Sequence, residues 1–175
     1  MRQAARKSAV IFAIACVVGG FAAERIAAQS QAPPMSSGGH ALNIAFNDLK
    51  WQKIVPELGE RSPELVILRV DPSTQATQLM IRVPKNTHVP KHWHTANETH
   101  TIMSGTFIIE CEGKRTELGA NSFNYVPSKM PHEAWTRPEE GALLFITVDG
   151  AWDINWVGGP PKPEDFTPKG TRQAP

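Results

Sequence analysis

Short, β-branched apolar segments, each ended by turn residues, constrain the fold of this chain more than any other feature of its sequence. The 15 prolines and 13 glycines of its 175 residues are scattered between apolar segments and indicate many turns and few long helices. A helical turn fits only at 47–58, where Pro56 limits its length. Strands are predicted at 64–70, 78–83, 99–103, 106–111, 122–126, 142–148 and 152–157. Such regular spacing predicts an all-β sandwich or barrel with little helix.

The first 28 residues have the layout of a secretory signal peptide. Arg2, Arg6 and Lys7 precede an apolar stretch at 8–23, and small residues follow at 26–28. The stretch has 16 residues, whereas a membrane span needs about 20. We therefore expect cleavage, a periplasmic or secreted protein, and no membrane contact afterwards. A retained N-terminal anchor is the alternative.

The rest of the chain divides by composition into three parts. Residues 29–45 are rich in Pro, Ser and Gly and are expected to be a flexible lead-in. Residues 46–157 carry the apolar segments and suit a single domain. Residues 158–175 resemble the lead-in in composition, so a disordered, Pro-rich tail is expected there.

Charge and cysteine content narrow the range of partners. Residues 1–28 hold 4 of the 18 basic and 1 of the 17 acidic residues, which leaves 14 against 16, or a net charge of −2. No basic block remains, so nucleic acid is not an expected partner. Cys111 is then the remaining cysteine, which excludes an intrachain disulfide. It alternates with Glu110 and Glu112, so we expect its side chain on the inner face of a strand.

Histidines concentrate in one short stretch of the chain. His92 and His94 are two residues apart, so on a strand both imidazoles face the same side, about 6.5 Å apart along the chain. After a bend, Glu98 begins the next strand and brings a carboxylate back beside them. Two imidazoles and a carboxylate form a donor set that borderline divalent metals favour.

The spacing H-x-H-x(3)-E-x(6)-G, from His92 to Gly105, resembles the first motif of the cupin family. Gly119, Pro127 and His132 resemble the second motif, and together the two motifs cover residues 92–135. The resemblance implies a single cupin domain, a jelly-roll-like β-barrel, that binds one divalent transition metal such as Fe, Mn or Zn. The ligands that it implies are His92, His94, Glu98 and His132.

The sequence departs from the second motif at two positions. Lys129 stands where the motif has glycine, and Thr136 stands where asparagine is common. If the turn before His132 needs a positive φ angle, a lysine there costs about 1 kcal/mol or more. Neither residue is an implied ligand.

Four further residues are candidates for the site. His100 lies two residues after Glu98 and should face the same interior, where it would be a proton-transferring catalytic residue, a neighbour of the ligands, an extra ligand or an ordinary pocket histidine. Phe107, Tyr125 and Trp135 would line a substrate pocket or simply pack in the core.

Three functions fit this pattern. The first is a metal-dependent enzyme that acts on a small organic molecule, for example a dioxygenase-like oxidoreductase, a decarboxylase or an isomerase. The second is a module that binds or senses a metal and a small molecule without turnover. The third is a β-domain whose metal serves stability, although closed sites of that kind often use thiolates, which are lacking here. The segment 64–70 is apolar on both faces, which favours a homodimer.

Overall fold

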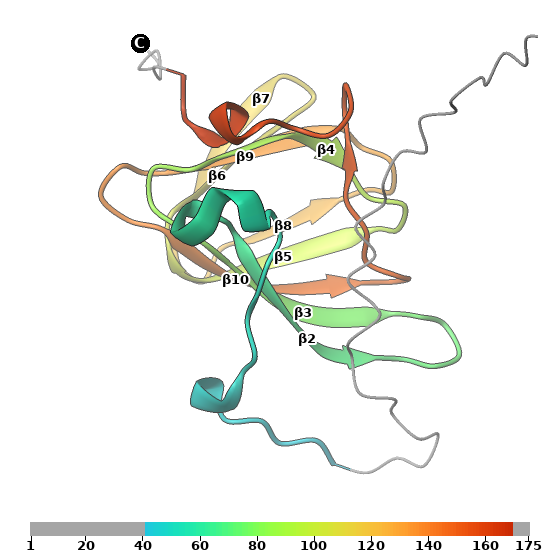
Figure 1. Cartoon of the computed structure of the whole chain (residues 1–175). Coiled ribbons are helices and arrows are strands. Elements are labelled where there is room, and N and C mark those ends of the chain that lie inside the picture. The colour runs from blue at the N-terminus through green and yellow to red at the C-terminus, as the bar shows by residue number, and fades with distance from the viewer. Residues whose placement is uncertain (1–40, 170–175) are drawn as a thin grey trace, which may run out of the picture.

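The computed structural model describes residues 41–169, and these residues form two antiparallel β-sheets that pack against each other (Figure 1). Within this part of the chain the larger sheet has the strand order β1-β2-β3-β10-β5-β8 and the smaller one β11-β4-β9-β6-β7. The larger sheet contains β1 (Gln52–Lys53), β2 (Glu64–Val70), β3 (Thr77–Val83), β10 (Ala142–Val148), β5 (Glu98–Gly105) and β8 (Phe123–Val126). The smaller sheet contains β11 (Asn155–Trp156), β4 (His88–Trp93), β9 (His132–Thr136), β6 (Phe107–Cys111) and β7 (Lys114–Leu118). This is the predicted all-β class.

Helical structure is limited to short 3-10 turns in the described residues. These are η2 (Phe46–Asp48), η3 (Pro56–Arg61) and η4 (Pro163–Phe166). None of them has the length or the apolar character that crossing a membrane requires. The predicted signal peptide, and the lead-in as far as residue 40, lie outside the described residues.

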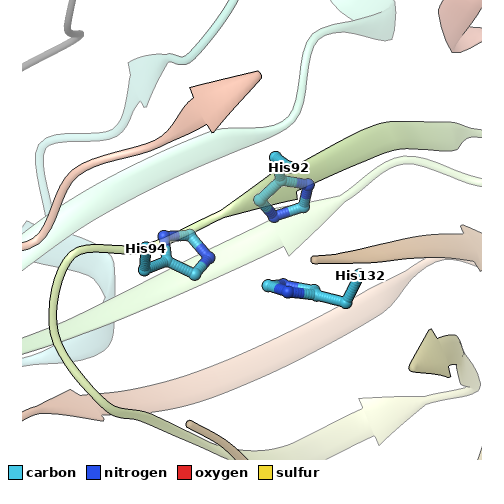
Figure 2. A group of neighbouring side chains, drawn as sticks. All are labelled: His92, His94 and His132. Atoms are coloured by element: carbon cyan, nitrogen blue, oxygen red, sulfur yellow. The ribbon is translucent and has the colours of Figure 1, made fainter. Parts of the chain in front are cut away.

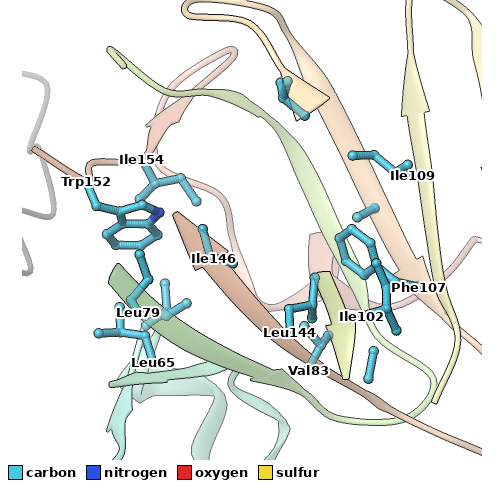
Figure 3. Close-up of a cluster of buried hydrophobic side chains, with 14 of the residues drawn as sticks. Leu65, Leu79, Val83, Ile102, Phe107, Ile109, Leu144, Ile146, Trp152 and Ile154 are labelled. Carbon is cyan, nitrogen blue, oxygen red and sulfur yellow. The ribbon is translucent and has the colours of Figure 1, made fainter. Parts of the chain in front are cut away.

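Side-chain alternation explains how the two sheets enclose one core. Along β10, Ala142, Leu144, Ile146 and Val148 are buried, while the residues between them are partly exposed. Their counterparts in the smaller sheet, such as Ile109, face them across the interior (Figure 3). The predicted strands at 64–70 and 142–148 have the observed bounds. Cys111 is half-buried and packs against this core, as its alternation with glutamates predicted.

The strand predicted at 152–157 is mostly irregular, because only Asn155–Trp156 pairs with β4. The Asp153 carboxylate accepts hydrogen bonds from the amide and hydroxyl of Thr95, and these bonds hold the segment away from a regular ladder. Trp152 and Ile154 are nevertheless buried in the core.

The prediction of a disordered tail is wrong for residues 158–169. Phe166, in η4, is only 2 % exposed, and its ring lies 5.9 Å from that of Trp156. The backbone carbonyl of Asp165 accepts a hydrogen bond from Nδ1 of His88 on β4, at 2.7 Å. One buried aromatic residue and this bond fix a segment whose composition alone is typical of disorder.

The motif glycine Gly105 allows β5 to end against the start of β10. Its φ is +74°, and a Cβ atom there would lie 1.9 Å from the carbonyl oxygen of Gly141. Only glycine combines this φ angle with so close an approach of two backbones. The same turn carries the chain across to β6 in the other sheet.

Candidate metal centre

Three predicted ligands, His92, His94 and His132, meet in the interior (Figure 2). His92 on β4 is the direct cross-strand partner of His132 on β9, and their ring centroids are 4.3 Å apart. His94 follows the end of β4, and its ring centroid lies 5.0 Å from that of His92 and 5.1 Å from that of His132. One donor atom from each residue lies within 4.8 Å of the other two, close enough for a single ion.

A β-bulge in β4 turns the side chains of both Val89 and His92 toward the interior. The register with β9 shifts between Val89 and His92, so both of these side chains point inward although they are three residues apart. A regular strand would place residues three apart on opposite faces. Bulges often redirect side chains next to active sites. Pro90 lies within the bulge, which is one of the positions where a strand accommodates proline.

Backbone carbonyls orient all three imidazoles. Nδ1 of His92 contacts the carbonyl oxygen of Pro90 at 2.7 Å, and Nδ1 of His132 contacts that of Met130 at 3.0 Å. Nδ1 of His94 contacts the carbonyl oxygen of Asp153. Because a carbonyl only accepts, each Nδ1 must carry the hydrogen, and the neutral imidazole then presents the lone pair of Nε2. Metal-ligating histidines are typically held in this way.

The fourth predicted ligand, Glu98, lies beside the three histidines rather than among them. Its side chain is 1 % exposed, and Oε2 lies 3.0 Å from Nε2 of His94 and 3.1 Å from Nε2 of His100. Its other oxygen, Oε1, accepts a hydrogen bond of 3.1 Å from the indole Nε1 of Trp152. A carboxylate buried this deeply needs a positive partner, and a divalent cation held by the imidazoles would supply one.

Burial and mutual contact set the protonation of these groups. Burial lowers the pKa of His92 well below its usual value, and the nearby His132 and His94 add to this. Burial likewise lowers the pKa of His132 to about 4. Burial also opposes the charged form of His94, but the Glu98 carboxylate outweighs it and raises that pKa. At Glu98, burial raises the carboxyl pKa, but His94 and His100 outweigh this effect and hold the pKa well below its ordinary range. Two lone-pair donors and one carboxylate are therefore ready at neutral pH.

The bend between His94 and Glu98 is fixed by hydrogen bonds from two other loops. The Asp153 carboxylate accepts from the Thr95 amide at 2.8 Å and from its hydroxyl at 2.6 Å. The Asp149 carboxylate accepts from the Asn97 amide at 2.9 Å. The Lys129 amide donates to the His94 carbonyl at 2.8 Å. The segment after β10 therefore positions the predicted ligands His94 and Glu98, a role that the sequence pattern did not predict because Trp152 and Asp153 lie more than 50 residues from these two.

His100 faces the interior, as predicted from its spacing. It is buried, its Nε2 contacts Glu98 and its Nδ1 contacts Oδ1 of Asn124 on the neighbouring β8. Its ring centroid lies 5.6 Å from that of Phe107 and 6.5 Å from that of His132. His100 is thus next to the donor set and outside the group of three that converges on one point.

A cavity of about 50 Å³ lies against the histidines. By this measure a water needs about 10–15 Å³, so the cavity has room for about four water-sized groups. Its polar lining residues are His92, His94, Glu98, His100 and His132. The rest of the lining is apolar and consists of Ile54, Pro63, Ile81, Val83, Val89, Phe107, Ala134, Leu144, Ile146, Trp152, Ile154, Trp156 and Phe166.

Of the three aromatic residues predicted to line the pocket, only Phe107 does so. Tyr125 is 53 % exposed on the outer face of β8, where its hydroxyl donates to Asn97. Trp135 lies on the outer face of β9, because it is three residues from the inward His132. Its ring stacks on His88 at 5.0 Å, and the Arg115 guanidinium lies over it at 4.1 Å. His88 is half-buried in this outer cluster.

Comparison with known proteins agrees with this geometry. Residues 79–150 match the family model of the cupin domain. This chain contains a cupin domain. The matched range holds the three clustered histidines, Glu98 and both sequence motifs. No curated protein matches the chain at a significant level.

Solved structures of cupin-fold proteins superimpose on the chain at low sequence identity. The polyketide cyclase RemF from Streptomyces resistomycificus has a TM-score of 0.59 and 18% identity, over 71% of this chain and 90% of its own. KdgF from Halomonas sp. has a TM-score of 0.52 and 14% identity, over 63% and 94%. The DMSP lyase DddQ from Ruegeria pomeroyi DSS-3 has a TM-score of 0.51 and 19% identity, over 58% and 56%. These likenesses establish a shared fold, while the activities belong to those proteins.

Proposed function

We propose that this cupin domain binds one divalent transition metal through His92, His94, His132 and Glu98 and uses it to convert a small organic molecule. The observation that carries the proposal is the orientation of the three imidazoles, whose Nδ1 atoms are engaged by backbone carbonyls. Three imidazoles and a carboxylate suit iron, manganese or zinc. Two of the similar folds, the polyketide cyclase and the DMSP lyase, carry the names of enzymes, which supports a catalytic use of such a domain.

The ion, the cavity walls and His100 would have different roles in the proposed reaction. The ion would supply Lewis-acid polarisation of a substrate atom. The apolar walls exclude water, which strengthens every charge interaction inside. His100 is the candidate proton-transferring group, because its Nε2 lies at the edge of the donor set while its Nδ1 contacts Asn124.

Metal content is the first test. Protein without residues 1–28 and without a histidine tag should contain about one equivalent of iron, manganese or zinc by elemental analysis. The His92→Ala/His94→Ala variant should lose it, whereas His88→Ala, which changes a histidine of the outer cluster, should keep it. Absence of bound metal, together with no thermal shift on adding any of these ions, would contradict the proposal.

A binding module without turnover is the second candidate. The small volume of the cavity favours it, because about 50 Å³ leaves little room for two reactants side by side. Metal-loaded protein that retains a bound small molecule unchanged, with no dioxygen uptake and no product by mass spectrometry, would identify a binder. Loss of substrate with stoichiometric product would identify an enzyme.

Export and self-association are further proposals. Export to the periplasm or beyond is supported by the layout of residues 1–28, and N-terminal sequencing of protein from cell fractions tests it. A homodimer is supported by Met103, Phe123 and Tyr125, which are 50–63% exposed on the outer faces of β5 and β8. Light scattering of the wild type and of Phe123→Ser would test the dimer.

A further inference from the structure

We infer that the ligand of this metal centre is a compact molecule with one metal-coordinating group and an otherwise apolar body, and that Trp156 limits its size. The inference rests on the proposed metal binding and adds the chemical class of the ligand. It follows from the composition of the cavity wall, from the cavity volume and from the position of one tryptophan between two cavities.

The wall of the cavity offers a ligand few polar contacts. Among its described lining residues there is no Lys, Arg, Asp, Asn, Gln, Ser or Thr. The one polar side chain there that is not a proposed ligand, His100, already has both ring nitrogens in contact with Asn124 and Glu98. A hydroxyl, ammonium or second acid group on the ligand would thus be buried without a partner, which costs several kcal/mol for a charged group.

Trp156 lines this cavity and also two further pockets. Trp156 is the cross-strand partner of His92, and the centroids of the two rings are 5.4 Å apart. On its other side lies a groove of about 230 Å³, which is lined by Ile54, Val55, Pro56, Glu57, Trp156, Pro160 and Pro161. Trp156 and Ile54 line both spaces, so they form the partition between the groove and the metal cavity.

The position of Trp156 also makes it the adjustable part of the wall. It lies in β11, a two-residue strand at the edge of the smaller sheet, and Phe166 of η4 packs on its ring. Gly158 and Gly159 follow it with φ angles of +92° and +95°. The other large residues of the wall, such as Ile146 and Trp152, belong to the fully buried core. Truncating Trp156 would join the cavity to the groove with little change to the core.

Two isosteric small acids test the ligand class. Protein loaded with Co²⁺ is titrated with propionate and with glycine, and binding is followed by the visible spectrum of the cobalt. The two acids share one carboxylate and differ in a methyl against an ammonium group. On an open metal ion glycine gains from chelation through its nitrogen, whereas in an apolar cavity the ammonium has no partner. We expect propionate to bind at least about tenfold more tightly than glycine.

A matched pair of variants tests the size limit. In Trp156→Ala, and in the milder Trp156→Leu, hexanoate should bind at least about tenfold more tightly than to the wild type, with propionate little changed. Trp135→Ala removes the same side chain from the outer face of β9, away from the cavity, and should leave the order of affinities unchanged. Retention of the cobalt spectrum in each variant shows that the site is folded.

The outcomes separate the two proposals. A cobalt spectrum that disappears in His92→Ala/His94→Ala, together with glycine binding as tightly as propionate, would overturn the ligand class and leave metal binding intact. Equal affinity for hexanoate in the Trp156 and Trp135 variants would overturn the role of Trp156. If Co²⁺ does not bind at all, metal binding and this inference fail together.

Discussion

The indole Nε1 of Trp152 donates a hydrogen bond of 3.1 Å to Oε1 of Glu98, and both side chains are almost fully buried. The bond joins the segment after β10 to the first residue of β5. It holds one carboxylate oxygen and leaves Oε2 facing His94 and His100. Trp152 is thus a positioning residue for the proposed metal centre.

The variant Trp152→Phe removes this donor while keeping an aromatic ring. We expect the metal affinity to fall by about 10- to 100-fold, because the orientation of a ligand by its hydrogen-bond partner has effects of this size. The metal-free protein should also lose about 1–3 kcal/mol of stability, since Oε1 is left buried without its donor. Competition with a chelator measures the first effect and urea unfolding the second. Trp135→Phe is the control, and equal metal affinity in both variants would contradict the role of Trp152.

Asp153 should make stability depend on pH in the acid range. Burial raises its carboxyl pKa, but hydrogen bonds from Thr95 outweigh this and lower the pKa below its ordinary value. A group whose folded pKa is lowered stabilises the fold above its unfolded pKa, and the effect is lost as pH falls through the folded pKa. Asp153→Asn should therefore cost about 1 kcal/mol at pH 7, and the cost should shrink below pH 4. Urea midpoints of metal-free protein from pH 3 to pH 7 check this, and a constant difference would refute it.

Lys129→Gly should stabilise the protein. Lys129 has a φ of +61° in the turn before His132, so the second motif does require the conformation that glycine favours. The left-handed conformation costs a residue with a side chain about 1–2 kcal/mol, and glycine avoids this cost. The greater freedom of glycine in the unfolded chain destabilises the fold by about 0.5–1 kcal/mol and offsets part of the gain. A net gain of about 0.5–1 kcal/mol is expected by thermal unfolding. The neighbouring Ser128→Gly should instead destabilise, because the Ser128 hydroxyl donates to the Thr95 carbonyl at 2.7 Å.

Cys111 should react slowly with thiol reagents. Burial raises its pKa, and the charges of Glu112 and Glu110 raise it further, so little thiolate is present at neutral pH. The rate with a chromogenic disulfide at pH 7.5 should be at least about tenfold lower in native protein than in urea. Protein without residues 1–28 is the right sample, since Cys16 is then absent. Equal rates in the two conditions would show that the thiol is accessible.

Short-range sequence patterns predicted much of the fold and of the candidate metal centre. The strands at 64–70 and 142–148 have their predicted bounds because each is a short run rich in β-branched residues that ends at turn residues. His92 and His94 share a site because of strand periodicity. His132 was placed beside them by family resemblance, and the structure pairs it directly with His92.

Features that depend on contacts between residues far apart in the sequence could not be predicted from the sequence. Trp135 was a candidate for the pocket wall or for core packing, although its spacing of three residues from His132 assigns it to the outer face. Phe166 lies in a Pro-rich segment, so composition concealed that one aromatic side chain docks on Trp156. The contact of Trp152 with Glu98 joins residues 54 positions apart, and local periodicity carries no information on such a pair.

The three carbonyl contacts at His92, His94 and His132 have a consequence for how such a site evolves. The groups that orient these rings are main-chain carbonyls, and a substitution at Pro90, Met130 or Asp153 does not itself remove them. Mutations can therefore remodel the walls of the cavity, one residue at a time, without turning the donors away from the ion. A lineage that inherits this backbone could change its ligand and still keep the proposed metal site.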